Sequence, residues 1–340
     1  MKILIDIKHP AQLNLFKGLA KELQTDGWDV TISYLERGKL PKIIHREYNE
    51  FSQKVAVGKS NGTRWSILWD GNIIRTLDFF KLIFKKKFNI TVAASSIPLA
   101  YASYFTSTPI IQFYDDPERK SVNRINGFFS NKLFFPPIVE TTKKIETFNC
   151  LKEWSYLSPA RFSPNKEVLK EYNLGEHNYI FIREVSNKSF NYYDQVDAIV
   201  GSIANKITPS IKVILSLEDK SLAHLYPANW TILQEPVSDI HSLIFYSKLV
   251  VSSGDSMARE GAMLGVPSIY CGIRKMKAND ILIEEGLLHH KPMDECIAAI
   301  NNFIARPFDD VAQHTVREKL KNQWDDMILF MKTKINQYKK

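Results

Sequence analysis

The sequence is poor in cysteine and has no long apolar run. Its three cysteines, Cys150, Cys271 and Cys296, are odd in number and show no CxxC or Cys/His ligand spacing, so the sequence suggests neither a disulfide framework nor a zinc site. No apolar run reaches the ~18 residues that cross a bilayer. The first residues, MKILIDIKHP, lack the apolar region and cleavage site of a signal peptide. We therefore expect a cytoplasmic protein without a bound metal.

Size and charge narrow the class of protein further. Hydrophobic residues make up 44% and charged residues 24% of the 340 residues, as in ordinary globular chains. This length favours two domains, at about 150 residues each. The formal net charge of +8 favours an anionic partner, such as nucleotide phosphates, a polyanionic acceptor or an anionic membrane face. No nucleic-acid-binding module is recognisable, so we expect no nucleic acid partner.

The first half of the chain alternates between strand and helix patterns. Residues 2–7 form a short apolar run, leucines then recur at helical spacing, and a second apolar run follows Gly27 at residues 29–35. Strand, helix and strand in that order make a βαβ unit, which builds a parallel sheet with buried strands. The alternation continues to about Phe148, so we expect one open α/β domain there.

A second series of strands and helices follows a connection that contains Pro159 and Pro164. Apolar runs predict the strands, and helical spacing predicts the helices between them. The expected strands are residues 178–185, 211–217, 230–237, 248–253 and 267–271, and the expected helices are residues 194–207, 238–247 and 256–264. The tail from Val311 to Lys340 has a long helical pattern with a basic end.

These patterns predict an α/β fold of two Rossmann-like, doubly wound parallel-sheet domains that face a cleft. We place the domains at residues 1–160 and 161–315, and we expect a C-terminal helix, residues 316–340, that packs back on the N-terminal domain. Ligands of open parallel sheets bind in the crevice at the carboxyl ends of the strands.

The stretch SSGDSMAREGAMLGVPSIY, Ser252 to Tyr270, follows an expected strand of the second domain. A helix N-terminus presents free N–H groups and a partial positive charge, and Gly254 lets an anion approach the backbone closely. One turn along, the carboxylate of Glu260 is placed to accept hydrogen bonds from two ribose hydroxyls. The pattern predicts a nucleoside diphosphate, with Ser253, Gly254, Asp255 and Ser256 around the phosphates and Glu260 on the ribose. As an alternative, Asp255 or Ser256 only caps the helix and Glu260 faces water.

The same stretch resembles the diphosphate and ribose motif of the GT-B superfamily. It is most similar to that of the non-hydrolysing UDP-N-acetylglucosamine 2-epimerases, whose pattern is Ser-Gly-Gly, a few residues, Glu, and then Leu-Gly-x-Pro. Residues 109–137, PIIQFYDDPERKSVNRINGFFSNKLFFPP, look like a second epimerase segment. The amino end, with KEWSYLSP and GLLHH, looks like a poorly characterised family of epimerase-related GT-B proteins. The resemblance implies the GT-B fold, with the acceptor side in the first domain and a nucleotide sugar, UDP-linked by this likeness, in the second.

The resemblance is weaker for the reaction, because most of the epimerase acid/base set is missing. The positions of its acidic residues fall at Ser95 or Ser96 and at Ser121, and its histidine falls near Arg183 and Glu184. We therefore favour a metal-independent GT-B glycosyltransferase of surface polysaccharide or glycoconjugate synthesis, with a saccharide or lipid-linked saccharide acceptor and no cofactor. A 2-epimerase or hydrolase with an altered acid/base set, and a non-catalytic nucleotide-sugar-binding protein, are the alternatives.

A transferase of this kind needs a cation for the leaving diphosphate and a base for the acceptor hydroxyl. Arg183, at the end of an expected strand, has a guanidinium group that can clamp phosphate oxygens. His9 follows the first strand and has a suitable ordinary pKa near 6.5, and Asp115 and Asp116 are rival bases.

Each of these residues also has a purely structural alternative. His9 can serve only at the helix entry, and Asp115 and Asp116 can form a turn with Pro117 or bind Arg124. Arg183 can pair with Glu184 or Asp194 as a surface ion pair.

Residues 64–88 combine aromatic residues, among them Trp65, Trp69 and Phe84, with a run of lysines. A basic, aromatic-rich amphipathic helix can rest on an anionic membrane, as would suit a lipid-linked acceptor at the inner face. The same apolar positions are what a helix needs to cover a parallel sheet, and this core-packing interpretation is favoured.

Overall fold

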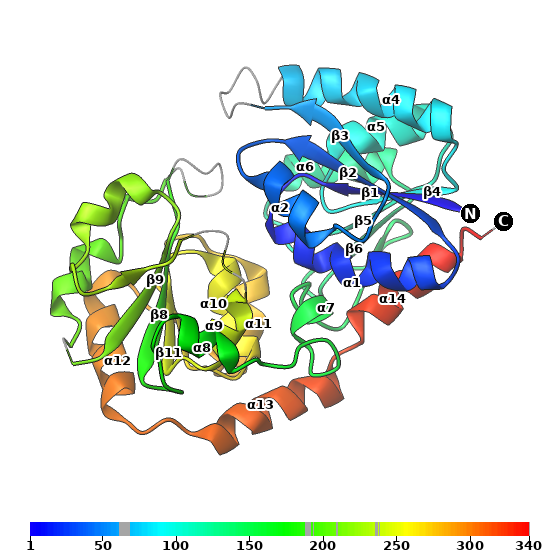
Figure 1. Cartoon of the computed structure of the whole chain (residues 1–340). Coiled ribbons are helices and arrows are strands. Elements are labelled where there is room, and N and C mark those ends of the chain that lie inside the picture. Colours follow the sequence, from blue (N-terminus) through cyan, green and yellow to red (C-terminus); the bar gives the residue numbers. More distant parts are fainter. Residues whose placement is uncertain are drawn as a thin grey trace. The chain divides into compact units, whose positions relative to one another are not determined.

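The computed structural model of the chain describes residues 1–60, 69–187, 192, 194–208, 210–234, 237 and 239–339, and only the backbone of Trp69. Trp65, and residues 235–236 and 238 of two expected elements, lie outside the described residues. The chain divides into two compact units (Figure 1). Unit 1 comprises Met1–Tyr156 and Trp324–Lys340, and unit 2 comprises Leu157–Gln323.

Unit 1 is built on a seven-stranded sheet in the order β3-β2-β1-β4-β5-β6-β7. Its strands are β1 (Lys2–Ile7), β2 (Asp29–Glu36), β3 (Lys54–Lys59), β4 (Ile90–Ala93), β5 (Ile110–Phe113), β6 (Lys132–Phe135) and β7 (Ile145–Thr147). Every neighbouring pair is parallel. The helical elements are α1 (Ala11–Thr25), α2 (Leu40–Glu47), the π-helical turn η1 (Trp69–Ile74), α4 (Arg75–Lys86), α5 (Ile97–Phe105), α6 (Lys120–Phe129), α7 (Trp154–Leu157) and α14 (Met327–Asn336).

Unit 2 has a six-stranded sheet in the order β10-β9-β8-β11-β12-β13. Its strands are β8 (Tyr179–Glu184), β9 (Lys212–Leu217), β10 (Thr231–Ile232), β11 (Leu249–Ser252), β12 (Ser268–Tyr270) and β13 (Leu288–His290), all paired in parallel. Its helical elements are α8 (Glu167–Glu171), η2 (Gly201–Lys206), η3 (Lys220–Leu225), α9 (Ile240–Phe245), α10 (Asp255–Met263), α11 (Lys277–Glu284), α12 (Met293–Ala305) and α13 (Asp310–Gln323). Two doubly wound parallel sheets confirm the predicted fold class.

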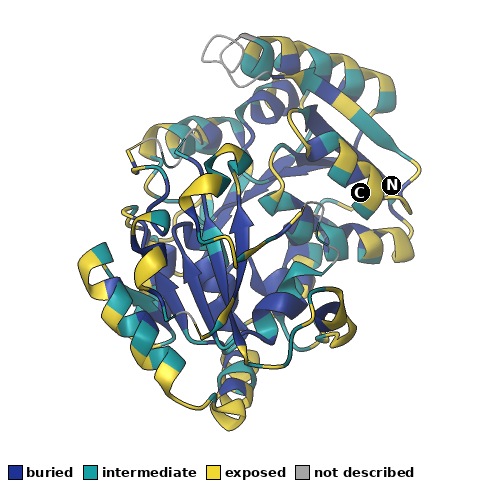
Figure 2. Ribbon diagram, turned by 60° about the vertical axis from the view of Figure 1, so that its left-hand side comes forward, coloured by how far each residue is buried: buried dark blue, intermediate teal, exposed yellow. Residues whose placement is uncertain are grey.

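The strands of both sheets are apolar because helices cover both of their faces. Figure 2 shows the central strands as buried, and the exposed residues lie mainly on the helices and loops around them. In α1 the leucines at helical spacing, Leu15, Leu19 and Leu23, are at most 1% exposed. Gly27, with φ +83°, follows the helix, in the left-handed conformation that glycine adopts without strain.

The prediction of a helix at residues 194–207 is wrong. Only Gly201–Lys206 is helical, as the short 3-10 helix η2. Ala198 has a φ of +52°, which a right-handed helix cannot contain. The backbone N–H of Val200 donates to the carboxylate of Glu184 at 2.7 Å instead of to a helical carbonyl. A buried acceptor on β8 therefore competes with the helical hydrogen bonds in this segment.

The expected single C-terminal helix is also divided. Helix α13 belongs to unit 2 and α14 to unit 1. Asp326 separates them because its carboxylate caps α14, accepting from the N–H groups of Ile328 at 2.9 Å and Leu329 at 3.1 Å. Lys332 of α14 pairs with Glu22 of α1, Nζ to Oε2, at 2.9 Å. The expected packing of the chain end on the N-terminal domain is confirmed for α14.

The order of the strands reverses once in each sheet. In unit 1 the strands β2 and β3 add to one edge of β1, and β4 then pairs with the other edge of β1. In unit 2 the strands β9 and β10 add to one edge of β8, and β11 then pairs with its other edge. Helices on opposite faces of the sheet leave a crevice at the carboxyl ends of such strand pairs, where ligands of open α/β sheets bind. The carboxyl ends of β1 and β4 in unit 1, and of β8 and β11 in unit 2, are therefore the candidate ligand-binding positions.

Candidate functional site

The turn after β11 lies at the strand reversal of unit 2. Ser253 is fully buried there, and its hydroxyl oxygen accepts a hydrogen bond from the N–H of Val185, just after β8, at 3.0 Å. The N–H of Ser253 donates to the carbonyl of Arg183 at 3.0 Å. These bonds join the two strand ends and fix the direction in which α10 starts.

Gly254 is the N-cap of α10. A Cβ atom at this position would lie 2.5 Å from Cγ1 of Val185, so a larger residue would force the turn apart. Gly254 has no side chain that could cap the helix, and the hydroxyl oxygen of Tyr192 accepts a long hydrogen bond, 3.4 Å, from the N–H of Asp255. The first N–H groups of a helix lack helical acceptors, and a helix N-terminus at a strand reversal is suited to bind an anion.

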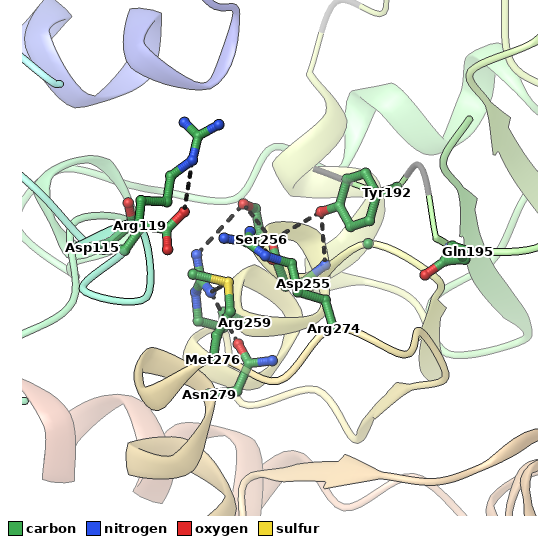
Figure 3. A network of polar contacts seen from close by, with 12 residues as sticks. Asp115, Arg119, Tyr192, Gln195, Asp255, Ser256, Arg259, Arg274, Met276 and Asn279 are labelled. Carbon is green, nitrogen blue, oxygen red and sulfur yellow. Dashed lines mark hydrogen bonds and ion pairs between the residues drawn. The ribbon is translucent and has the colours of Figure 1, made fainter. Parts of the chain in front are cut away.

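Asp255 is the first residue of α10 and is only 3% exposed. Its carboxylate accepts hydrogen bonds from the guanidinium of Arg274 at 2.9 Å and the hydroxyl of Tyr192 at 3.1 Å (Figure 3). The alternative in which Asp255 or Ser256 caps the helix is wrong, because Gly254 holds that position. Asp255 therefore enters this network as a carboxylate already paired with a cation.

Gln195 extends this network to the loop after β12. Its side-chain amide donates to the carbonyl of Ser253 at 3.2 Å and accepts from the N–H of Ile273 at 3.3 Å. The residue is 3% exposed. It therefore ties the β11–α10 turn to the segment that carries Arg274. The pKa of Tyr192 is raised well above its ordinary value, mainly by burial and then by the charge of Asp255, which keeps its hydroxyl a donor.

A second arginine lies inside α10. The side chain of Arg259 is fully buried, and its guanidinium donates to the amide oxygen of Asn279 on α11 at 2.9 Å and to the hydroxyl of Ser256 at 3.5 Å (Figure 3). It also lies 3.7 Å from the sulfur of Met276. A buried guanidinium raises the positive potential around the first turn of the helix.

Glu260 is 8% exposed, so the alternative in which it faces water is wrong. Its Oε2 lies 3.6 Å from Nε2 of His241 on α9. The carboxylate thus stands one helical turn from Ser256, next to a ring nitrogen that can donate a hydrogen bond. Glu260 is therefore a hydrogen-bond acceptor on this side of α10, with the imidazole of His241 as its polar neighbour.

Arg183 is the last residue but one of β8, and its guanidinium binds the end of the neighbouring strand β9. It donates to the hydroxyl of Ser216 at 3.0 Å and to the carboxylate of Glu218 at 2.8 Å. The surface ion pair that was the structural alternative for Arg183 is therefore present, but its partner is Glu218 and not Glu184 or Asp194. The Glu218 side chain is 40% exposed, and ion pairs with exposed partners contribute little to stability.

The strand reversal of unit 1 holds an amine that the sequence interpretation passed over. The Nζ of Lys8, after β1, donates to the carbonyl of Ser95, after β4. Burial lowers the pKa of this lysine from 10.5 to about 8, with a further contribution from Arg75. Its backbone N–H donates to Gln12 at 2.8 Å, whose amide in turn donates to the carbonyl of Ala94 at 2.7 Å.

His9 follows Lys8 and is exposed. Its Nδ1 accepts a hydrogen bond from the N–H of Ala11 at 3.2 Å. The structure therefore gives His9 the helix-entry contact that was its structural alternative, at the first residue of α1.

Asp115 and Asp116 follow β5, and each carboxylate has a cationic partner within unit 1. Asp115 pairs with Lys152, and Asp116 lies 3.9 Å from Nε of Arg119. Arg119, not the expected Arg124, is the arginine at this turn. Both carboxylates are therefore already engaged in ion pairs.

The residues that the sequence interpretation missed share one signal. Lys8 directly follows β1, in the segment DIKHP, and Arg274 is in the loop that follows β12, in the segment CGIRK. A charged residue directly after a buried strand is placed at the ligand-binding edge of the sheet.

The chain is similar throughout to proteins of one family. The model of the family described as "Protein of unknown function (DUF354)" matches residues 1–339. The protein MJ0665 of Methanocaldococcus jannaschii is 20% identical over 325 residues, which are 90% of this chain and 92% of that protein.

Solved structures show the same architecture. The UDP-GlcNAc 2-epimerase from Neisseria meningitidis bound to UDP-GlcNAc has a TM-score of 0.73 at 12% identity, over 99% of this chain and all 100% of that one. Glycosyltransferase VinC in complex with dTDP has a TM-score of 0.66 at 11% identity, over 99% of each chain. Similarity at these identities shows the fold. The chain belongs to the DUF354 family, and its two doubly wound units have the GT-B fold.

Proposed function

We propose that this protein binds a nucleoside-diphosphate sugar in unit 2 and transfers the sugar to a hydroxyl group of a saccharide or lipid-linked saccharide. The observation that carries the proposal is the N-terminus of α10 at the strand reversal of unit 2, with a glycine as its N-cap and with Arg274 beside its first residue. The similar epimerase and transferase structures hold UDP-GlcNAc and dTDP, which supports a nucleoside diphosphate as the ligand.

The diphosphate is assigned to the N–H groups that open α10. Gly254 leaves the backbone bare where the phosphate oxygens would approach, and the helix dipole favours their charge. Because Arg274 already neutralises Asp255, the carboxylate repels the phosphates less than its position suggests. Arg183 is a further cation at the end of β8, and its partly exposed pair with Glu218 can exchange for a phosphate.

The ribose is assigned to Glu260. A carboxylate can accept two hydrogen bonds from adjacent hydroxyls, and this one is nearly buried one helical turn from the phosphate end. Burial strengthens such charge-assisted hydrogen bonds because water competes less. His241, 3.6 Å away, orients the carboxylate in this proposal.

Transfer suits the residues of unit 1 better than epimerisation does. An acceptor oxygen attacks the anomeric carbon, the bond to the diphosphate breaks, and the acceptor proton passes to a base. Lys8, with a pKa of about 8, takes this proton in our proposal when it is neutral, and His9 is the second candidate. Asp115 and Asp116, which the sequence also offered as bases, are paired with Lys152 and Arg119 and are less suited.

Proton NMR of UDP-N-acetylglucosamine incubated with the protein tests the proposal, with and without a mixture of saccharide acceptors. Transfer predicts UDP and a new glycosidic anomeric signal only when an acceptor is present. A signal of the C2 epimer would assign the protein to the epimerases. Free sugar without an acceptor would make it a hydrolase, and binding without any conversion across acceptors would support the non-catalytic alternative.

A further inference from the structure

Three helices on one face of unit 1 present large apolar side chains to the surface. Helices α4, α5 and α6 lie next to one another in this order (Figure 1). The exposed side chains are Leu77 and Phe84 of α4, Tyr104 and Phe105 of α5, and Phe128 of α6, with exposures of 50–68%. We name these five residues the α4–α6 patch.

The aromatic rings of the patch are continuous from helix to helix. The ring centroids of Phe80 on α4 and Phe105 on α5 are 6.2 Å apart, and Tyr104 lies 6.1 Å from Phe128 on α6. Phe84 follows Phe80 by one turn of α4, so it extends the same face. Contiguous exposed apolar surface of this kind marks an interaction site.

Packing against the sheet does not account for these side chains. Phe79 and Ile83 of α4 are at most 2% exposed and belong to the core with Leu99 of α5. Phe84 is 68% exposed and stands beside this buried stripe. The core-packing interpretation of the sequence therefore explains one side of α4 and leaves the patch without a role.

Positive charge accompanies the patch. Lys81, Lys85 and Lys87 are exposed at the C-terminal half and end of α4. On α6 a surface hollow of about 530 Å³ lies between Phe128, Phe129, Arg124 and Lys144. Aromatic and aliphatic side chains beside several lysines fit the boundary between acyl chains and anionic headgroups.

The aromatic residues of the patch lie toward one end of unit 1, and Leu77 extends it along α4 to the first turn of that helix. Phe84, Phe105 and Phe128 stand in the last turns of their helices, and β4, β5 and β6 begin a few residues later. The aromatic part of the patch is therefore near the amino ends of these strands, whereas Lys8 and Ser95 lie at the carboxyl ends. A surface bound there would leave the carboxyl edge of unit 1 open.

We infer that the α4–α6 patch docks unit 1 on an anionic lipid bilayer, with the aromatic side chains in the interface and the lysines on the headgroups. Among the described residues no helix is long and apolar enough to cross a membrane, and docking of this kind needs none. The inference goes beyond the proposed function and does not depend on nucleotide binding.

Co-sedimentation with vesicles tests it. One set of vesicles contains phosphatidylcholine with about 30% of the anionic lipid phosphatidylglycerol, which gives the surface a negative potential, and the other contains phosphatidylcholine alone. The wild-type protein should sediment with the anionic vesicles only. The affinity of the triple variant Phe84→Ser, Phe105→Ser, Phe128→Ser for anionic vesicles should be lower by about tenfold or more. The charge variant Lys85→Glu, Lys87→Glu should lose affinity to a similar extent.

Matched controls come from exposed residues elsewhere. Val311→Ser with Leu329→Ser removes apolar side chains that are 76% and 60% exposed, and Lys42→Glu with Lys206→Glu reverses two exposed charges. Both should bind vesicles as the wild type does, and all variants should keep their melting temperature and UDP affinity. The inference is overturned if the wild-type protein stays in solution or if the patch variants bind vesicles as the wild type does. It is also overturned if the wild type is a dimer without vesicle binding and the patch variants are monomers.

Discussion

The guanidinium of Arg274 lies 2.9 Å from the carboxylate of Asp255 at the first residue of α10. A carboxylate in the first turn stabilises the helix dipole, but it also repels a phosphate that approaches the same N–H groups. The arginine offsets this repulsion and is itself a phosphate-binding group. Arg274 therefore makes the electrostatic potential at the proposed diphosphate site more positive, and Asp255 makes it more negative.

Changing the two partners separately should change UDP affinity in opposite directions. Arg274→Gln removes the cation and should weaken binding about tenfold to a hundredfold, the range for a hydrogen bond to a charged group. Asp255→Asn removes the repulsion, so affinity should be equal or higher. Isothermal titration calorimetry measures both, with Arg306→Gln at the exposed end of α12 as the control. Equal losses in both variants would mean that the pair acts only on the fold.

Glu260→Gln should weaken UDP binding by about tenfold or more, because a ribose hydroxyl then loses a charge-assisted acceptor. The effect should be smaller for UDP analogues that lack a ribose hydroxyl, since those never made the full contact. Glu284→Gln, at the exposed end of α11, is the matched control. If Glu260→Gln binds UDP and the deoxy analogue with unchanged affinities, the ribose assignment is wrong.

Gly254→Ala should disturb the turn before α10. The added Cβ would meet Val185 Cγ1 at 2.5 Å, and overpacking of this kind costs about 1–3 kcal/mol. Urea denaturation should show this loss together with weaker UDP binding. Val185→Ala in the same chain should recover part of both, because it removes the clashing methyl group.

Gly127→Ala in α6 is the control for that substitution, since its nearest contact would be an ordinary 3.6 Å. Alanine has the higher helix propensity, so this variant should be as stable as the wild type or slightly more stable. A loss of the same size at both glycines would contradict the steric explanation.

Lys8 should make stability rise with pH in a defined window. Its pKa is about 8 in the folded chain and 10.5 as the ordinary value, so between these values the unfolded chain binds more protons and the free energy of unfolding increases with pH. Below pH 8 the charged lysine costs about 3 kcal/mol by this difference.

Comparison with Lys8→Met isolates this titration. The stability of the variant relative to the wild type should fall as pH rises from 8 to 10.5, because only the wild type gains from losing the proton. Urea denaturation at several pH values measures the difference, and Lys42→Met, exposed on α2, should show no such change. A constant difference across the window would mean that the amine is not held in the proposed environment.

The sequence predicted those features that rest on local patterns. The apolar runs of β1 and β11, the leucines of α1 and the start of α10 near Ser256 follow from periodicity and from the small-residue turn. The two doubly wound parallel sheets follow from the alternation of strands and helices and from the family resemblance, whereas their strand orders were not predicted. These features need no knowledge of distant partners.

Features that depend on distant partners were not predictable in this way. Arg183 binds Glu218 because β9 lies beside β8, and Glu184 accepts the N–H of Val200, which is 16 residues along the chain. The importance of Lys8 comes from the carbonyl of Ser95, which is far along the chain but adjacent in the sheet. Long-range strand neighbours decide each of these contacts, and one sequence does not show them.

Hydrogen exchange of backbone amides, followed by mass spectrometry with and without UDP, tests the central claim most directly. The N–H groups of the first turn of α10 lack helical acceptors and should exchange fast in the free protein. The account predicts that UDP slows exchange in peptides covering residues 254–260, and that Arg274→Gln reduces this protection. Protection confined to other segments, at UDP concentrations that calorimetry shows to be saturating, would contradict the proposed diphosphate site.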